Sequence, residues 1–154
     1  MDSILDSFYR NLIQGASYLT VLKGLWTTLI ISVVSLLLGT LLGAMVCYLR
    51  INHNRIVRGI TSLYIAVLRG SPVLLVLMLL YYVVFAKSGL DAIYVAIAAF
   101  SLNVSAHVAE LLRSALNTVD RGQIEAARTL GFGRWGAFRH ITLPQLLVVA
   151  RPVY

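Results

Sequence analysis

The sequence predicts an all-α protein that crosses a membrane several times. Of its 154 residues, 59% are hydrophobic and only 12% are charged, and the mean hydropathy is +0.84. A soluble domain of this composition would expose large apolar patches to water, so the bilayer is its natural solvent. A spanning helix needs about 20 apolar residues, and the chain is long enough for three such helices and part of a fourth.

The N-terminal residues 1–18 are predicted to form an amphipathic segment that lies at the outer face of the membrane. Apolar residues recur there at helical spacing, opposite polar ones, although a frayed leader with accidental periodicity is an alternative interpretation. The first span is predicted at about residues 19–49, where only Lys23 interrupts the apolar run. Gly39 and Gly43 form a G-x-x-x-G pair in this span, which would let another helix approach closely.

Two further spans are predicted at about residues 60–86 and 92–112. The segment Arg-Gly-Ser-Pro at residues 69–72 cuts into the first of them. A fourth span is predicted to begin at about Pro144, after a loop over residues 113–143. The sequence stops at Tyr154 in the middle of an apolar run, so we expect it to be a fragment of a longer chain.

Arginines gather in the loop after the first span and in the loop over residues 113–143. The net charge is +7, but arginines beside apolar spans are typical of the positive-inside pattern, not of nucleic-acid binding. The N-terminus is therefore predicted outside, and both loops are predicted in the cytoplasm. The arginines are Arg50, Arg55, Arg58, Arg113, Arg121, Arg128, Arg134 and Arg139.

The loop over residues 113–143 contains a predicted short helix. Asp120 can cap its start, and Gln123 completes a capping-box pattern three residues later. Ile124 lies on one face with Ala127 and Leu130, and Gly131 is well placed as the C-terminal stop. The pattern predicts a compact helix-turn unit that docks on a soluble partner. A connector that only touches lipid is the alternative.

The same loop carries a motif with fixed spacing. Glu-Ala-Ala at residues 125–127 is followed by three residues, Gly131, nine residues and Ile-Thr-Leu-Pro at residues 141–144. This pattern resembles the cytoplasmic EAA loop of bacterial ATP-binding-cassette importer permeases, through which ATP hydrolysis is coupled to transport. The resemblance implies an ATPase-coupling role for Gln123, Glu125, Ala126, Ala127, Gly131, Ile141, Leu143 and Pro144.

Other segments resemble the polar amino acid branch of these permeases and extend the likeness to nearly the whole chain after Leu19. They are Gly-Leu-Trp-Thr-Thr-Leu at 24–29, Leu-Arg-Gly-Ser-Pro-Val-Leu at 68–74, Ser-Leu-Asn at 101–103, Ala-Glu-Leu-Leu-Arg at 109–113 and Gly-Gln-Ile-Glu-Ala-Ala at 122–127. Leu77 stands where this branch commonly has Gln, and His107 stands where it usually has Tyr. Both residues lie in predicted spans, so these two departures bear on which solute is transported. The resemblance implies a MetI-like fold whose last one to two helices are missing from this sequence.

The resemblance implies a multi-pass permease subunit of the bacterial inner membrane that imports polar amino acids, with residues 1–18 on the periplasmic side. The implied partners are a second permease subunit, identical or different, two ATP-binding subunits, a periplasmic or lipid-anchored solute-binding protein, and membrane lipid. ATP and Mg²⁺ would be bound by the ATP-binding subunits, and no cofactor by this chain. The alternatives are a permease of the same superfamily for another solute, and a non-transporting scaffold that recruits a soluble protein.

The sequence contains no motif of an enzyme active site. It lacks the Gly-Lys-Ser/Thr loop that binds phosphates, so we do not expect the chain to hydrolyse ATP itself. No nucleophile, histidine and carboxylate occur at a usable spacing, and no metal site is predicted. Cys47 is the single cysteine, so the sequence predicts no disulfide framework, and Cys47 is expected to be a small core or lipid-facing residue.

Polar residues inside the predicted spans mark two candidate elements of a translocation path. Arg69, Gly70, Ser71 and Pro72 predict a broken helix, which is tolerated at membrane depth where it lines a pathway. The alternative is a helix that begins at Pro72 and leaves Arg69 at the cytoplasmic surface.

The second candidate element is a polar stripe on one face of the third span. Asn103, His107 and Glu110 recur at helical spacing and are assigned to the path or gate. In the alternative interpretation, Glu110 forms a structural ion pair with Arg113 or with Arg69 on the neighbouring helix.

Overall fold

The computed structural model describes residues 17–51 and 54–150, so the predicted segment 1–18 lies almost wholly outside the described residues. The part that is described is helical, without strands. In chain order the helices are α2 (Ser17–Arg50), α3 (Arg55–Gly70), α4 (Val73–Leu79), the π-helix η2 (Leu80–Val84), α5 (Ala92–Thr118), α6 (Arg121–Thr129), α7 (Arg134–Ala137), the π-helix η3 (Phe138–Thr142) and α8 (Leu143–Ala150).

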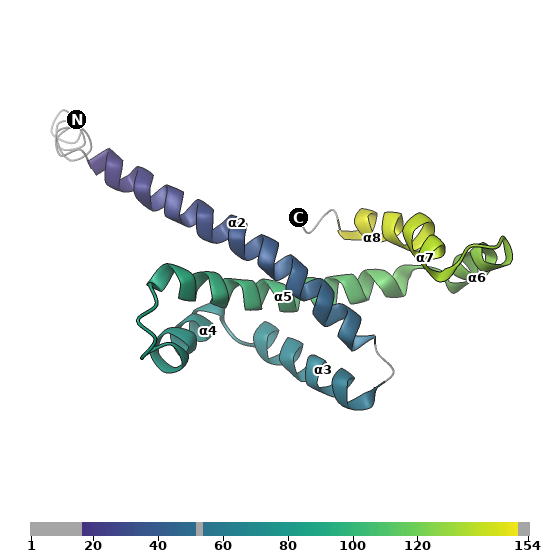
Figure 1. Cartoon of the computed structure of the whole chain (residues 1–154), viewed down its shortest axis with the longest axis horizontal. Helices are drawn as coiled ribbons and strands as arrows, with labels where there is room; N and C mark the ends of the chain where they lie inside the picture. The colour runs from purple at the N-terminus through teal and green to yellow at the C-terminus, as the bar shows by residue number, and fades with distance from the viewer. Residues whose placement is uncertain (1–16, 52–53, 151–154) are drawn as a thin grey trace, which may run out of the picture.

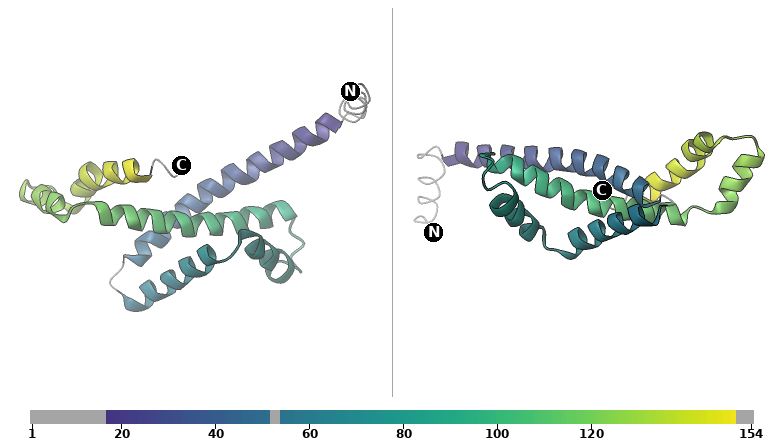
Figure 2. Two further views of the ribbon diagram at one scale, coloured as in Figure 1. Left: turned by 180° about the vertical axis from the view of Figure 1, so that it is seen from behind. Right: turned by 60° about the horizontal axis from the view of Figure 1, so that its bottom comes forward.

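Two long helices, α2 and α5, cross each other and form the frame of the molecule, and α3 packs beneath their crossing (Figure 1). The segments Tyr18–Arg50 and Ala92–Thr118 are long and apolar enough to cross a membrane. Helix α6 lies at the end of α5, and the chain then returns through α7 and η3 to α8, which packs against α5. Two further views show the same hairpin-like return at one end of the molecule (Figure 2).

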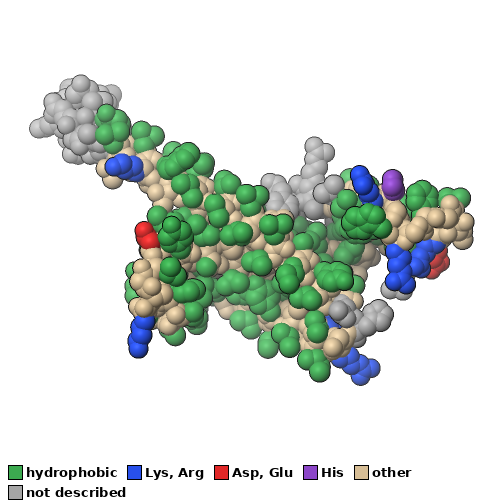
Figure 3. Space-filling model, viewed as in Figure 1, with side chains coloured by type: hydrophobic (Ala, Val, Ile, Leu, Met, Phe, Trp, Pro, Cys, Tyr) green, Lys and Arg blue, Asp and Glu red, His purple; other side chains and the backbone are tan. Residues whose placement is uncertain are grey.

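Hydrophobic side chains cover most of the surface of α2 through α5 in the face shown in Figure 3, whereas charged side chains gather near the two ends of the molecule. Leu41 is 70% exposed and Leu37 62%, although both lie in the middle of α2. Such exposure would be unfavourable in water but suits a helix whose neighbours are lipid chains. The structure therefore confirms the predicted membrane-protein class.

The G-x-x-x-G pair of α2 lies directly against α5. A Cβ atom added to Gly39 would come within 2.6 Å of the Val104 side chain, and one added to Gly43 within 2.7 Å of the Val108 side chain and 2.8 Å of the Ser105 carbonyl oxygen. Only glycine allows the two backbones to approach this closely. The close helix approach predicted from the pair is confirmed.

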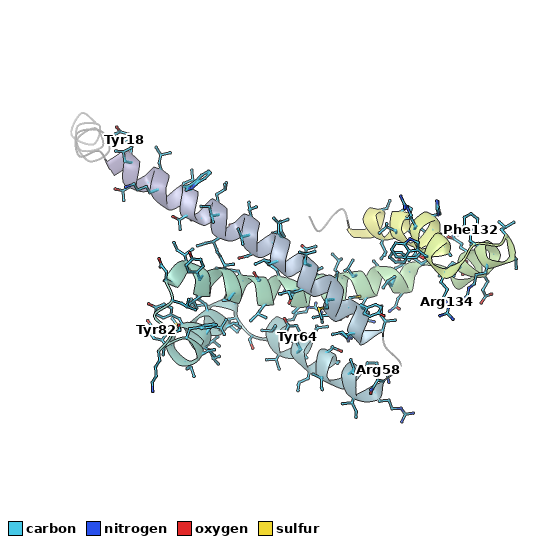
Figure 4. All side chains as sticks on the ribbon, in the orientation of Figure 1. Tyr18, Arg58, Tyr64, Tyr82, Phe132 and Arg134 are labelled. Atoms are coloured by element: carbon cyan, nitrogen blue, oxygen red, sulfur yellow. The ribbon has the colours of Figure 1, made fainter. Side chains whose placement is uncertain are left out.

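The core where α2, α3 and α5 meet contains Cys47, Ile65 and Ala109, each of which is buried. Cys47 is a free thiol that is only 3% exposed, so of the two predicted places for it, core or lipid face, the structure shows the core. Beside this core, Tyr64 points from α3 to α5, where its hydroxyl lies 2.6 Å from Ser105 Oγ (Figure 4). This hydrogen bond joins α3 to α5 in addition to their apolar packing.

Replacing Tyr64 with phenylalanine should therefore lower stability without changing the packing. Loss of one inter-helix hydrogen bond in a membrane protein costs roughly 0.5–1.5 kcal/mol. We expect a lower thermal unfolding midpoint in detergent, measured by loss of monodisperse protein on heating. Tyr48→Phe is the matched control, because Tyr48 is 75% exposed on α2. Equal midpoints for the two variants would contradict this role for the hydroxyl.

Three predicted boundaries need correction. The apolar region predicted at 60–86 begins earlier and ends earlier, as Arg55–Gly70 and Val73–Val84, with a 108° bend at the predicted cut. The third helix was predicted to end at residue 112 but continues to Thr118, because nothing in residues 113–118 breaks a helix. The last helix was placed at about Pro144, whereas helical structure begins at Arg134 and continues without a break through η3 into α8.

Candidate functional site

Helix α6 is held at its start as predicted, but by one side chain instead of two. Asp120 Oδ1 accepts a hydrogen bond from the Gly122 backbone N–H at 2.9 Å, which satisfies a free donor of the first turn. The other half of the predicted capping box is not formed. Gln123 Oε1 instead accepts a 2.6 Å hydrogen bond from Gln145 Nε2 of α8. Gln123 therefore ties α6 to the returning helix.

Gly131 ends α6 in a left-handed backbone conformation, with φ at +86°. Its N–H donates to the Arg128 carbonyl at 3.1 Å, and the Phe132 N–H donates to the Ala127 carbonyl at 3.1 Å. These two bonds form a Schellman motif, which satisfies the last carbonyls of the helix and reverses the chain. The structure confirms that Gly131 is the C-terminal stop.

A shallow groove of about 410 Å³ lies between α6 and the helix that returns from it. It brings together residues from both halves of the motif, which are separated in the sequence. The residues that line it are Gln123, Ala126, Ala127, Leu130, Phe132, His140, Ile141, Pro144 and Gln145. Five of these were predicted as coupling residues, and Leu130, Phe132, His140 and Gln145 were not assigned to the site.

The remaining predicted coupling residues lie outside this groove. Glu125 is exposed on α6, Leu143 is 38% exposed at the start of α8, and Gly131 forms the turn between them. Ala127 is only 2% exposed, whereas Leu130 is 78% exposed. The helix face predicted to be apolar is thus partly packed against the returning helix and partly exposed.

Pro144 explains the π-helical turn before it. A proline has no N–H and its ring clashes with the carbonyl four residues earlier, which here belongs to His140. In η3 the hydrogen bonds reach one residue further, as in the bond from the Leu143 N–H to the Phe138 carbonyl. The wider turn keeps the helix continuous and places Ile141 and Pro144 at the groove.

A cluster of three charged side chains lies where the end of α2 meets α5. Glu110 Oε2 accepts from Arg50 Nη1 at 2.7 Å, and Glu110 Oε1 accepts from Arg113 Nε at 3.1 Å and from Arg113 Nη2 at 2.5 Å. The pair with Arg113, which was the alternative interpretation of Glu110, is present. Arg69 is not a hydrogen-bonding partner, and Arg50, which the sequence analysis missed, takes that place.

The other predicted path residues lie near the break between α3 and α4. Arg69 and Gly70 end α3, Ser71 and Pro72 form the bend, and all four except Ser71 are exposed. The predicted interruption of the helix is confirmed. Across from it on α5, Asn103 Nδ2 donates to the Leu68 carbonyl at 3.4 Å.

His107 lies one turn further along α5 and is exposed, with Nδ1 3.0 Å from the Asn103 carbonyl. Glu110, on the same stripe, is occupied by its two arginines. The stripe therefore contains the ion cluster at Glu110, the amide of Asn103 beside the end of α3, and the exposed imidazole of His107.

Among the described residues, no group of three or more histidine, cysteine or acidic side chains could hold a metal ion. The described residues combine an exposed short helix, α6, with a helix pair bent by 108° at Ser71 and Pro72.

Comparison with known proteins agrees with this arrangement. Residues 35–152 match the protein family described as the binding-protein-dependent transport system inner membrane component. The chain is 40% identical over 138 residues to the probable amino-acid ABC transporter permease protein YckA of Bacillus subtilis, covering 88% of this chain and 61% of that one. It is 38% identical over 133 residues to the L-cystine transport system permease protein TcyL of the same species, covering 81% and 56%.

The fold has a counterpart among solved structures. A chain from the crystal structure of an amino acid ABC transporter with histidines superposes with a TM-score of 0.76 at 31% identity, over 92% of this chain and 67% of that chain. The present chain thus spans about three fifths of the length of the curated relatives that it matches. By sequence and by fold, the chain belongs to the family of binding-protein-dependent transport system inner membrane components, the permeases of ABC transporters.

Proposed function

We propose that this chain is the permease subunit of an ATP-driven importer of polar amino acids in the bacterial inner membrane, and that α6 couples it to an ATP-binding subunit. The observation that carries the proposal is the exposed, capped helix α6 at the Arg-rich end of the molecule. Asp120 and Gly131 fix its two ends, and Gln123 ties it to α8. A helix held in this way moves as one body when a partner pushes it.

The distribution of charge supports an orientation with the N-terminus outside and α6 in the cytoplasm. The end of α2 with the first turns of α3, and the segment from the end of α5 to η3, carry most of the arginines of the chain, and positive residues favour the cytoplasmic side. On that side α6 meets a soluble ATPase, which supplies ATP, Mg²⁺ and the hydrolysis site. A second permease subunit and a solute-binding protein complete the assembly.

The names of the relatives support amino acids as the solute class. The two relatives from Bacillus subtilis are named as a probable amino-acid permease and an L-cystine permease. Another relative, from Agrobacterium fabrum, is named as a nopaline permease. In this proposal the bend at Ser71 and Pro72 works as the gate, with Asn103 and His107 on the opposite helix. Broken helices at membrane depth are the usual place for such a site.

Reversal of the Glu125 charge should uncouple the chain from its ATPase. Glu125 is exposed on α6, and an acidic side chain at such an interface selects a basic partner. When the complete transporter is purified in mild detergent, Glu125→Lys should recover about tenfold less ATP-binding subunit, which corresponds to roughly 1.4 kcal/mol. Asp91→Lys is the matched control, because it also replaces an acidic residue with lysine, but at the start of α5, the end that is remote from α6.

Uptake distinguishes the proposal from the alternatives. ATP-dependent uptake of a labelled polar amino acid by the reconstituted complex supports it, and loss of that uptake in Glu125→Lys but not in Asp91→Lys supports the role of α6. Uptake of another solute only would identify a permease of different specificity. Recovery of a soluble partner without any uptake would indicate a scaffold, and equal recovery of the ATPase with both variants would contradict the coupling role.

A further inference from the structure

We propose that Glu110 is a positioning residue, which fixes the cytoplasmic end of α2 to α5 and hence to the helix that receives the push of the ATPase. The inference rests on the proposed function in one respect, namely that an ATP-binding subunit moves α6. The contact itself, between Glu110, Arg50 and Arg113, is independent of it. We call these three residues the carboxylate clasp.

The clasp joins two helices through one carboxylate. One oxygen of Glu110 is bound by Arg50, which is the last residue of α2, and the other by Arg113, one turn further along α5. Arg113 orients the carboxylate from within its own helix, and Arg50 reaches it from 60 residues away in the sequence. Each arginine therefore binds a different oxygen of the carboxylate, and only Arg50 links it to α2.

Burial makes these contacts stronger than ordinary surface ion pairs. The side chains of Arg50 and Glu110 are 20% and 21% exposed, and they lie above the core formed by Cys47, Ile65 and Ala109. Partly desolvated ion pairs are costly to break on one side, because the remaining charge keeps its desolvation cost without its partner. Removal of the carboxylate also leaves two arginines facing each other at short range.

A short and rigid path connects the clasp to α6. From Glu110, α5 continues as regular helix to Thr118. Val119 follows and is only 6% exposed, and Asp120 is already the cap of α6. Only two residues link the two helices, one of them buried and the other hydrogen-bonded to the first turn of α6, so a displacement of α6 reaches the clasp through α5.

The glycine contacts between α2 and α5 lie further from the cytoplasmic end than the clasp, whereas the core contact of Cys47 lies next to it. The glycine contacts at Gly39 and Gly43 fix how closely the helices approach, but the last turns of α2 extend beyond them to Arg50. The clasp holds this end. Without it, we expect the end of α2 to move more freely relative to the unit formed by α5 and α6, because only the core contact of Cys47 remains there.

Distance measurements between spin labels on α2 and α6 test this inference. In the complete protein in lipid nanodiscs, labels would replace Tyr48 and Arg128, which are both exposed, in a Cys47→Ala background. We expect Glu110→Gln to widen the distance distribution roughly twofold, because the inter-helix ion pair is lost. Arg50→Ala should do the same.

Two further variants separate positioning from general stability. Arg50→Lys keeps the charge and one donor, so its distribution should stay as narrow as that of the parent. Arg58→Ala removes an exposed arginine of α3 outside the clasp and should also leave the width unchanged. If Glu110→Gln yields no folded protein, the Arg50→Ala and Arg50→Lys pair makes the same comparison.

A lower unfolding midpoint with unchanged width in Glu110→Gln and Arg50→Ala would overturn the inference, because it would show a role in stability alone. Uptake is measured on the same preparations. If the parent shows no uptake but the clasp variants widen the distribution, the proposed function fails and the positioning role stands. If the parent imports and the widths do not change, the importer stands and the positioning role fails.

Discussion

A Gly43→Val variant should insert into the membrane but fail to form a stable fold. The added side chain would place its Cβ 2.7 Å from Val108 and 2.8 Å from the Ser105 carbonyl oxygen. The Val108 side chain could adjust, but the Ser105 carbonyl oxygen is part of the backbone in the middle of α5 and cannot move away without a shift of the helix. Overpacking of this kind costs about 1–3 kcal/mol, and here it also separates the two helices that form the frame of the molecule.

The expected result is a large loss of monodisperse protein in detergent and a clear fall in the unfolding midpoint. Gly24→Val is the matched control, since Gly24 lies on the same helix and a Cβ there has no atom within 4 Å. Gly39→Val should resemble Gly43→Val, because it faces Val104 in the same way. If the Gly24 and Gly43 variants were equally stable, the close packing of α2 on α5 would be wrong.

A Gly131→Pro variant should fold in the membrane but lose the coupling proposed for α6. Proline fixes φ near −65°, whereas this residue requires +86°. It also removes the N–H that donates to the Arg128 carbonyl. The local cost is about 3 kcal/mol, which corresponds to roughly a 100-fold lower population of the native turn. ATP-dependent uptake should fall accordingly, while the amount of protein in the membrane changes little.

Gly133→Pro tests whether this effect comes from the turn conformation or merely from a proline in the loop. Gly133 has a φ of −65°, which proline adopts without strain, and a Cβ there has no atom within 4 Å. Asparagine tolerates the left-handed region, so Gly131→Asn should retain most of the uptake. Normal uptake and normal recovery of the ATP-binding subunit with Gly131→Pro would exclude a coupling role for the end of α6.

The features that the sequence predicts well depend on residues close together in the chain. Asp120 and Gly131 mark the two ends of α6 because capping and left-handed turns depend on residues a few positions apart. The break at Ser71 and Pro72 follows from the missing proline N–H. The capping box was wrong at Gln123 because a distant residue, Gln145, competes for that side chain.

By itself, the sequence determined the membrane class, the approximate spans, the short helix α6 and the family, since these depend on composition and on local or fixed spacing. Only the tertiary structure decided that Glu110 is held by Arg50, that the glycines of α2 face α5, and that Gln123 binds Gln145. The physical reason is that α2 is apolar around its whole circumference, because lipid is as apolar as a protein core. Its periodicity therefore cannot show which face packs, and the pairing of distant polar groups follows only once the helices are in place.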